Sequence, residues 1–455
     1  MLIENIHAHI NSNREQDINT LIELVSHPSI SSNAVEIRRC AEFLKNIMEE
    51  SGINTKIYET KGQPVVIGEV ASHNKDATTV LFYGHYDVQP PEPLDAWVSP
   101  QFEPTIREGR LYGRGAGDNK GQLLTHIMAV RSYLATEGAL PINVKFIFEG
   151  EEEIGSPSLL EFVEDNKELL KADVVLTSDG PIHDSGAPLV AFGVRGVMNF
   201  EFNLETATTD NHSGNKGGVI PNAIWKMVDL LATMKDKDDK VTIAGFYDDV
   251  VIPSPYELSL IDNLPFDPIS LAKVYGVERI ELDKVKFYER LLFLPTLTIN
   301  GIEGGYTGKG TKNIIPCKAT AKMEVRLVLN QDPKDIFNKV KNHVTKTNPN
   351  VIVTQEEEDM KPSRTSAELP ISRAIVNAVW EGFDQEPIVL PSMGGSLPDF
   401  VWTKGLGVPS IMIPYANADE ANHAPNENMM LECFYKGIHS SAQIIFELGK
   451  LKEQK

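Results

Sequence analysis

Basic charge is scarce in this sequence relative to acidic charge. The chain of 455 residues has 43 Lys and Arg residues against 64 Asp and Glu residues, which gives a formal net charge of −21. A nucleic-acid-binding surface is basic, and anionic membranes attract basic segments, so this balance argues against both partners. The acidic excess favours solubility and is compatible with the binding of cations.

Paired cysteines and long apolar runs are also missing. The three cysteines, Cys40, Cys317 and Cys433, are far apart and form no CxxC motif. An odd number of widely spaced cysteines indicates a reduced, intracellular protein without a disulfide framework. The N-terminal residues lack the apolar segment of a signal peptide, and no apolar run approaches the roughly 20 residues of a membrane span. We therefore expect a cytoplasmic protein.

The first part of the chain has the pattern of an α/β domain. Its apolar runs are nearly continuous, as in strands buried on both faces, and amphipathic helical patterns precede them and alternate with them. This pattern predicts a mostly parallel sheet. The runs lie at 64–70, 79–84, 143–148 and 173–178, and the helical patterns include 18–25, 37–48 and 122–134.

The pattern changes near residue 195, where polar and apolar residues begin to alternate. The elements that follow have the order βαββαβ, which predicts a separate α+β, ferredoxin-like domain. These elements are a strand at 198–204, a helix at 220–234, strands at 294–301 and 319–330, a helix at 332–344 and a strand at 351–358. Residues 361–370 resemble a linker, and the α/β pattern resumes with a helix at 371–383 and a strand at 407–415. The predicted domains are 1–194 together with 364–455, and an inserted domain at 195–363.

Unusual polar residues follow four of the predicted strands of the first domain. In open α/β sheets, ligands bind at the carboxyl ends of the strands. Imidazoles mixed with carboxylates, without thiolates, suit Zn²⁺, Mn²⁺ or Co²⁺, and this many negative ligands favours two bridged ions over one. The residues are His85 and Asp87 in GHYD, the glutamates of EGEEE at 149–153, Asp179 in TSDG, His423 in ANHAPNE, and Asp118 in the loop GRGAGDNKG.

Each of these motifs is weak when it is taken alone. A single histidine is usually an ordinary surface or core residue, and EGEEE could be the solvated start of a helix, where acidic residues are favourable. GRGAGDNKG lacks the third glycine of GxGxxG and the GK[ST] of a P-loop, which argues against nucleotide binding. The combination is much more specific than any of its parts.

In their order, GHYDVQP, LYGRGAGDNKG, EGEEEIGS, TSDG, DNHSG and ANHAPNE resemble the motifs of the M20 family of metallopeptidases. The resemblance covers nearly the whole chain, and GFYDD at 245–249 is most similar to the carnosinase-like dipeptidase branch. It implies a zinc-peptidase-like catalytic domain with an inserted lid and dimerisation domain. It also implies two metal ions, most often Zn²⁺ with Mn²⁺ or Co²⁺ as alternatives. In that arrangement His85 and Asp179 bind one ion, Glu153 and His423 bind the other, and Asp118 bridges both.

The same resemblance assigns residues around the metals. Asp87 orients His85, and Glu152 is the general base that acts on a metal-bridging water to give hydroxide. Glu149 and Glu151 receive no role. Asp at position 179 accompanies dipeptidases and aminopeptidases in the family, whereas Glu accompanies deacylases and carboxypeptidases.

Three further residues are assigned through the inserted domain and a late loop. His212, in DNHSG, matches a histidine that reaches the partner subunit's active site and stabilises the oxyanion. Arg326 is predicted to be exposed, because apolar residues alternate with it, and it matches an arginine that holds the substrate's terminal carboxylate. Ser396, in MGGSLPD, resembles a loop at the same carboxylate. Asn119 departs from the aspartate of many relatives, at a peptide bond that is cis in the family.

The function that the sequence predicts is hydrolysis of dipeptides or short peptides with a free C-terminal carboxylate by a homodimeric, dinuclear metal enzyme. An N-acyl-amino-acid deacylase with the same metal centre is the first alternative. A metal-dependent binding protein or inactive relative is the second, and the presence of every ligand together with Glu152 argues against it.

Overall fold

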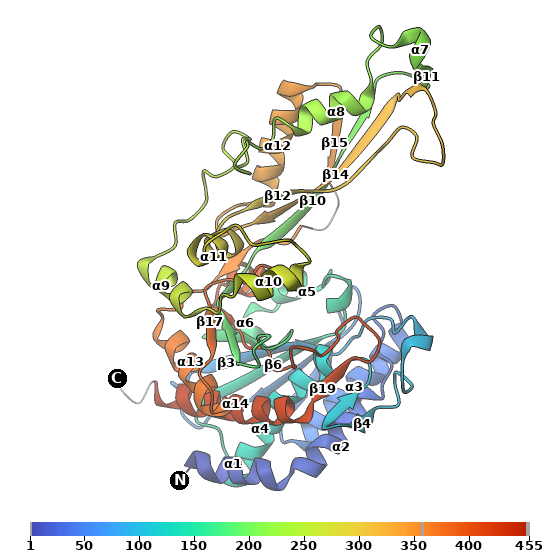
Figure 1. The fold of residues 1–455 in the computed structure, drawn as a ribbon. Coiled ribbons are helices and arrows are strands. Elements are labelled where there is room, and N and C mark those ends of the chain that lie inside the picture. The colour runs from blue at the N-terminus through green and yellow to red at the C-terminus, as the bar shows by residue number, and fades with distance from the viewer. Residues whose placement is uncertain (1, 356–358, 452–455) are drawn as a thin grey trace.

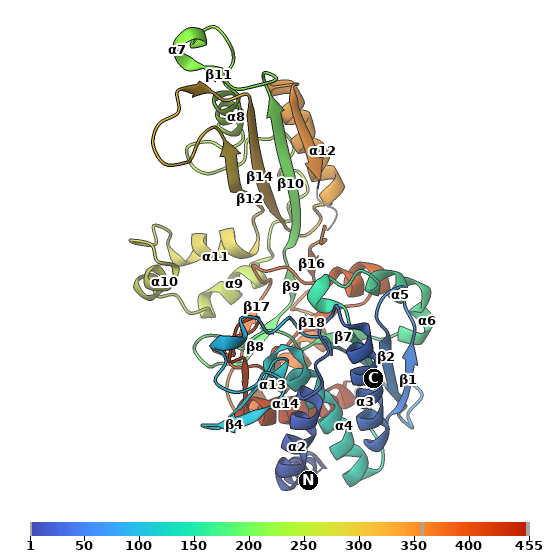
Figure 2. The ribbon, with the colours of Figure 1, turned by 90° about the vertical axis from the view of Figure 1, so that its right-hand side faces the viewer.

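Two β-sheets organise the protein in the computed structural model, which describes residues 2–355 and 359–451. The main sheet has eight strands in the order β1-β2-β6-β3-β7-β18-β8-β17, and the small sheet has four in the order β12-β14-β10-β15. Figures 1 and 2 show the small sheet above the main sheet, with the first and last helices both beside the main sheet. The main-sheet strands are β1 (Asn54–Tyr58), β2 (Val65–Val70), β3 (Thr79–His85), β6 (Asn143–Glu149), β7 (Val174–Thr177), β8 (Leu189–Ala191), β17 (Ile388–Leu390) and β18 (Ser410–Met412).

The main sheet is mixed, so the prediction of a mostly parallel sheet was wrong in part. Strand β3 pairs in parallel with β6 and β7, β18 pairs in parallel with β7, and β17 does so with β8. The pairs β1–β2, β2–β6 and β8–β18 are antiparallel. The chain between β1 and β2 is only residues 59–64, and a parallel pair needs a crossover of roughly a dozen residues or more, so this pair must be a hairpin.

Both faces of the main sheet are buried, which explains the nearly continuous apolar runs. In β3, Val80 and Phe82 pack into one core, and Leu81 and Tyr83 pack into another on the opposite face. The first core contains residues of α1 (Leu2–Ser12), α2 (Arg14–Val25), α3 (Ala34–Glu50), α4 (Gln122–Glu137), α13 (Pro370–Phe383) and α14 (Leu431–Lys450). The second contains residues of α5 (Leu159–Asp165) and α6 (Lys167–Leu170).

The small sheet is antiparallel and has the βαββαβ element order expected from the sequence. Its apolar face, including Phe200 and Phe202, forms a core with α8 and α12. Three helices, α9–α11, interrupt the order between α8 and β12, and residues of α9 and α11 form a separate apolar core. The predicted strand at 351–358 is observed over Val351–Gln355, and residues 356–358 lie outside the described residues. The elements are β10 (Gly196–Glu205), α8 (Ala223–Leu231), α9 (Pro255–Asn263), α10 (Pro268–Tyr275), α11 (Lys284–Leu292), β12 (Thr296–Gly304), β14 (Lys318–Leu327), α12 (Pro333–Thr347) and β15 (Val351–Gln355).

The two chain segments that join the sheets lie side by side. Strand β9 (Gly193–Val194) leads towards the small sheet, β16 (Ser363–Arg364) returns from it, and the two pair antiparallel. The predicted linker at 361–370 is packed, since Ser363 and Thr365 are buried and Thr365 Oγ1 accepts a hydrogen bond from the backbone N–H of Ser410. Within the described residues, no helix is both long and apolar enough to cross a membrane.

Candidate metal centre

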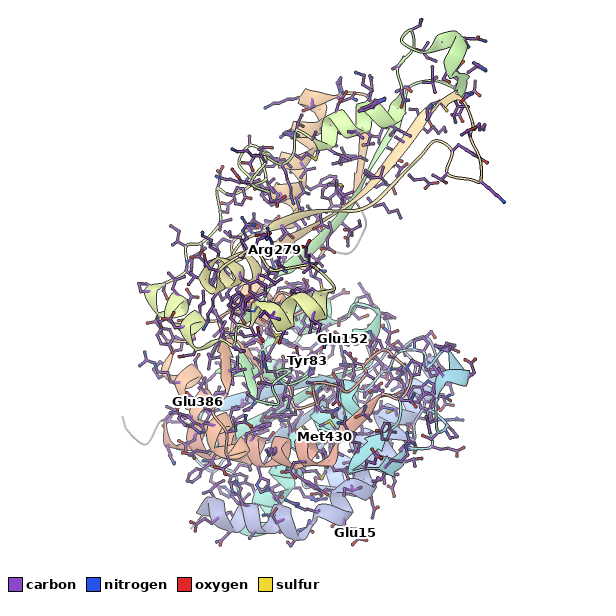
Figure 3. The ribbon with its side chains drawn as sticks, in the orientation of Figure 1. Glu15, Tyr83, Glu152, Arg279, Glu386 and Met430 are labelled. Carbon is purple, nitrogen blue, oxygen red and sulfur yellow. The ribbon has the colours of Figure 1, made fainter. Side chains whose placement is uncertain are left out.

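The ends of four neighbouring strands bring the predicted polar residues together. Because β6, β3, β7 and β18 pair in parallel, their carboxyl ends share one edge of the main sheet. His85 is the last residue of β3, Glu149 ends β6, and Asp179 follows β7 by two residues. His423 lies in the loop after β18. Figure 3 shows Glu152 and Tyr83 on the side of the main sheet that faces the small sheet.

Two groups of side chains at this edge can each hold a metal ion. The first contains His85, Asp118 and Asp179, and the second contains Asp118, Glu153 and His423; within each, the potential ligand atoms lie within 4.8 Å of one another. His85 Nε2 is 3.1 Å from Asp118 Oδ1 and 3.7 Å from Asp179 Oδ2. His423 Nε2 is 3.0 Å from Asp118 Oδ2 and 3.1 Å from Glu153 Oε2. The two oxygens of Asp118 therefore belong to different groups.

The donor atoms fit a pair of divalent cations. His85 is fully buried, and its Nε2 has no hydrogen-bond partner among the described residues although carboxylate oxygens are close. Buried carboxylates repel one another unless a cation or protons compensate them. Imidazole nitrogens with carboxylate oxygens are a ligand set for zinc, manganese or cobalt.

The charged groups at this edge shift one another's pKa values. Hydrogen bonds to Asp118 and Glu153 raise the pKa of His423 to about 10. Burial, against the opposing effect of His85, raises the pKa of Asp179 to about 6. The neighbouring carboxylates thus favour the protonated form of His423, and a metal ion that binds His423 would have to displace that proton.

Asp87 connects the histidine of one group with the glutamate loop of the other. Its buried Oδ1 accepts a hydrogen bond from the backbone N–H of Glu152 at 3.2 Å and lies 3.3 Å from His85 Nδ1. Its Oδ2 accepts from Ser31 Oγ at 2.7 Å and from the backbone N–H of Glu153 at 3.1 Å. His85 Nδ1 also lies 3.2 Å from the backbone carbonyl oxygen of Asp87. Asp87 therefore contacts both the imidazole ring and the loop that carries Glu152 and Glu153.

Glu152 lies beside the first group of potential ligands. It lines a small cavity together with Tyr83, Asp179, Leu397 and Trp402, among other residues. Burial raises the pKa of Glu152 well above its usual value, and the negative charges of Asp179 and Asp118 add to this while His85 opposes it. A carboxyl group with a raised pKa next to a metal site is suited to accept and release protons.

The other two glutamates of the loop have structural contacts that the sequence did not indicate. Glu149 Oε1 accepts hydrogen bonds from Tyr83 Oη at 2.6 Å and from Ser156 Oγ at 2.8 Å, and burial raises the pKa of Glu149 to about 7. Glu151 Oε1 accepts from the backbone N–H of Gln63 at 2.9 Å. These contacts hold the glutamate loop on β3 and on the chain before β2.

Asn119 joins the ends of β3 and β7 through its amide group, since its Oδ1 accepts from the backbone N–H of His85 at 3.4 Å. Its Nδ2 donates to the carbonyl of Ser178 at 2.7 Å and to Asp179 Oδ1 at 3.1 Å, and the Asp118–Asn119 peptide bond is cis. An aspartate here would face the carboxylate of Asp179 without a proton to donate. The asparagine instead supplies a donor to a potential metal ligand.

Two buried glutamates near Asp118 were missed by the sequence reasoning. Glu427 accepts hydrogen bonds from the backbone N–H groups of Gly117 and Asp118 and pairs with Arg114 at 2.7 Å, which orients the Asp118 loop. Glu420 is 1% exposed, and neither carboxyl oxygen has a partner among the described residues. Both glutamates lie within one short segment with His423, and this proximity in the sequence was the signal that could have indicated them.

The remaining predicted residues are not members of the two groups. Arg326 donates from Nη1 to Ser396 Oγ at 2.8 Å, so the structure brings these two together. The side chain of Arg326 is 28% exposed and pairs with Glu324, so it is less exposed than predicted. His212, in β11 (Asn211–His212), is exposed at the far end of the small-sheet region, remote from Glu152 in this chain (Figures 1 and 3).

Solved structures share this architecture over nearly the whole chain. The M20 family metallo-carboxypeptidase Sso-CP2 from Sulfolobus solfataricus is 35% identical, with a TM-score of 0.84, covering 96% of this chain and 99% of that chain. Human carnosine dipeptidase 1 is 27% identical, with a TM-score of 0.77, covering 99% of both chains. A mixed α/β fold of this kind with adjoining imidazole–carboxylate groups defines a metallopeptidase.

Sequence comparison gives the family. Peptidase family M20/M25/M40 matches residues 81–447, and the chain therefore belongs to this family. Among its relatives, Cys-Gly metallodipeptidase dug1 of Schizosaccharomyces pombe is 27% identical over 486 residues, covering 99% of both proteins. Human Beta-Ala-His dipeptidase is 28% identical over 475 residues, covering 99% of this chain and 93% of that protein.

Proposed function

We propose that the protein is a dinuclear metal-dependent hydrolase that cleaves dipeptides or short peptides with a free C-terminal carboxylate. The observation that carries this proposal is the membership of Asp118 in both ligand groups, with Glu152 beside them. Relatives named as Cys-Gly and Beta-Ala-His dipeptidases, which align over nearly the whole chain, support the dipeptide as the substrate class.

His85 and Asp179 would hold one metal ion, Glu153 and His423 the other, and Asp118 both. Zn²⁺ suits these ligands best, and Mn²⁺ and Co²⁺ are the alternatives. When bound, the two cations polarise the scissile carbonyl and make water a stronger acid.

Glu152 is the proposed general base. Its carboxylate removes a proton from the attacking water and returns it to the nitrogen of the leaving amine. Asp87 accepts a hydrogen bond from the backbone N–H of Glu152 and contacts His85, so one residue holds both the loop of the base and the ligand. Arg326 and Ser396 are proposed to hold the terminal carboxylate of the substrate, which positions the scissile bond.

We also propose a homodimer formed through residues 195–363, the predicted lid. Strand β12 is an edge of the small sheet, and apolar side chains of β12 and α8 are exposed beside it, including Ile302 at 53% and Trp225 at 67%. An unpaired edge next to apolar residues favours pairing with a second copy. His212 would then reach the partner's site and stabilise the oxyanion there.

We also propose that the protein is located in the cytoplasm. Cys40, Cys317 and Cys433 are free and buried in the structure, which suits a reducing compartment.

Removal of single C-terminal residues from longer peptides is a second candidate function. It is supported by the 35% identity to Sso-CP2, whose name describes a metallo-carboxypeptidase. Both reactions require a free C-terminal carboxylate and differ in the length of peptide that the site accepts.

A substrate panel on metal-reconstituted protein separates these functions. The panel pairs an unblocked dipeptide with its N-acetylated amino-acid counterpart and with a longer peptide of the same C-terminal residue, each with Zn²⁺, Mn²⁺ or Co²⁺. We expect the highest kcat/KM for the dipeptide. A preference for the N-acetylated amino acid would establish the deacylase instead, and no turnover with any metal would favour a binding protein.

A further inference from the structure

A group of charged residues near Ser396 contains two arginines and only one carboxylate. The side chains are Arg195, which follows β9, and Arg326 and Glu324 on β14. Burial and, after it, the neighbouring charge of Arg326 lower the pKa of Arg195 to about 10, and the charge of Glu324 opposes them. A net positive charge therefore remains in a part of the protein that is largely shielded from water.

The charge of Arg326 is already compensated by Glu324. Arg326 Nε donates to Glu324 Oε1 at 2.9 Å, and Nη2 donates to Oε2 at 3.2 Å. This two-point contact fixes the plane of the guanidinium group. Nη1 donates to Ser396 Oγ, so Arg326 is an oriented donor rather than a free cation.

Arg195 has no such partner. The residue is 9% exposed, and within the described residues its one side-chain hydrogen bond runs from Nε to the carbonyl of Gly394 at 2.8 Å. No acceptor for Nη1 or Nη2 occurs among residues 2–355 and 359–451. A buried, uncompensated arginine is unfavourable unless an anion binds to it.

The loop next to Arg195 connects it with the catalytic edge. The backbone N–H of Arg195 donates to the carbonyl of Gly395, one residue before Ser396. The residue after Ser396 is Leu397, which lines the same cavity as Glu152 and Asp179. A substrate carboxylate bound at this loop would therefore lie next to the cavity that contains the proposed base, Glu152.

We propose that Arg195 supplies the uncompensated positive charge that binds the C-terminal carboxylate of the substrate, while Arg326 and Ser396 act as oriented hydrogen-bond donors. The assignment rests on the proposed function and makes Arg195 a specificity-determining residue. A C-terminal amide carries no charge, so Arg195 separates free-acid peptides from their amides.

The test is equilibrium binding, which does not depend on turnover. L-alanyl-L-alanine and its C-terminal amide are titrated calorimetrically into metal-loaded protein that carries Glu152→Gln, with and without Arg195→Gln. We expect the free acid to bind more tightly than the amide, and Arg195→Gln to weaken the free acid by about 10- to 100-fold, as for a lost charged hydrogen bond. Amide binding should stay unchanged, and Arg195→Lys should retain part of the preference.

Arg38→Gln is the control, because it removes an arginine charge from α3, beside the main sheet, where Arg38 pairs with Glu59 at the surface. It should change neither affinity. Equal weakening of acid and amide by Arg195→Gln would mean that Arg195 only supports the Gly394 loop, and would overturn the proposal. Absence of any acid preference in the Glu152→Gln protein would overturn it as well. Acid-selective binding that depends on Arg195, without peptide hydrolysis by the unmodified protein, would instead refute the proposed function alone.

Discussion

Replacement of Asp87 by Asn tests whether one carboxylate fixes both halves of the metal centre. The four groups around Asp87 are Ser31 Oγ, His85 Nδ1 and the backbone N–H groups of Glu152 and Glu153. An amide keeps one accepting oxygen and replaces the other by an NH₂ group. The least costly orientation of the introduced amide keeps its oxygen towards His85 Nδ1 and the backbone N–H of Glu152. Its NH₂ group then faces Ser31 Oγ and the backbone N–H of Glu153.

The magnitude follows from that orientation. The Ser31 hydroxyl can rotate to accept, but the N–H of Glu153 cannot, so a buried donor loses its partner at a cost of about 1–3 kcal/mol. The lost hydrogen bond belongs to the backbone of Glu153, a proposed metal ligand. Residues that hydrogen-bond to metal ligands typically contribute about 10- to 100-fold to metal affinity. Asp87→Asn should therefore lower both the free energy of unfolding and the metal affinity.

The assays are chemical denaturation of the metal-free protein and titration of Zn²⁺ into it. Asp17→Asn is the matched control, because Asp17 is also buried and paired, with Arg131 on α4, but lies away from the metal centre. It should lower stability and leave metal affinity unchanged. Unchanged metal affinity in Asp87→Asn would refute the reasoning.

Three further predictions follow from the site. Glu152→Gln should keep its metal content but lose turnover by about 10²- to 10⁴-fold, and full activity would exclude Glu152 as the base. Since Glu149 has a pKa of about 7 when folded and an ordinary one when unfolded, it stabilises the metal-free protein at low pH, and that contribution is lost as pH rises through 7. Glu149→Gln should flatten that pH dependence, measured by thermal unfolding between pH 4 and 8, and an unchanged profile would contradict the buried-acid assignment. Mixing His212→Ala with Glu152→Gln subunits should restore activity, and no recovery in verified heterodimers would exclude action across a dimer.

The positions of the predicted ligands could be inferred from the sequence because strand ends are easy to locate. His85 and Asp179 follow apolar runs that are buried on both faces, and parallel strands place such ends at one edge. The structure brings both together with Asp118. Roles that depend on contacts between segments far apart in the sequence were harder to predict. Glu149 and Glu151 meet Tyr83 and the chain before β2, and no spacing in the sequence encodes those contacts.

The fold was predicted less completely than the strand ends. Helix α1 was missed because its sequence is mostly polar, although Ile6 and Ile10 share its buried face. The helices α9–α11 were missed although Ser254 and Glu257 form a capping box at the start of α9. The mixed character of the main sheet depends on which strands become neighbours, and apolar pattern alone does not specify that.

The most direct test of the account is the number of metal ions that each subunit binds. Metal-free protein is dialysed against Zn²⁺ and the bound ions are counted by mass spectrometry, for the unmodified chain, Asp118→Asn and Glu153→Gln. Two ions per chain, both weakened by Asp118→Asn and one by Glu153→Gln, are the result we predict, because Asp118 belongs to both groups. A single ion in the unmodified chain, or the loss of only one ion on Asp118→Asn, would contradict a shared dinuclear centre.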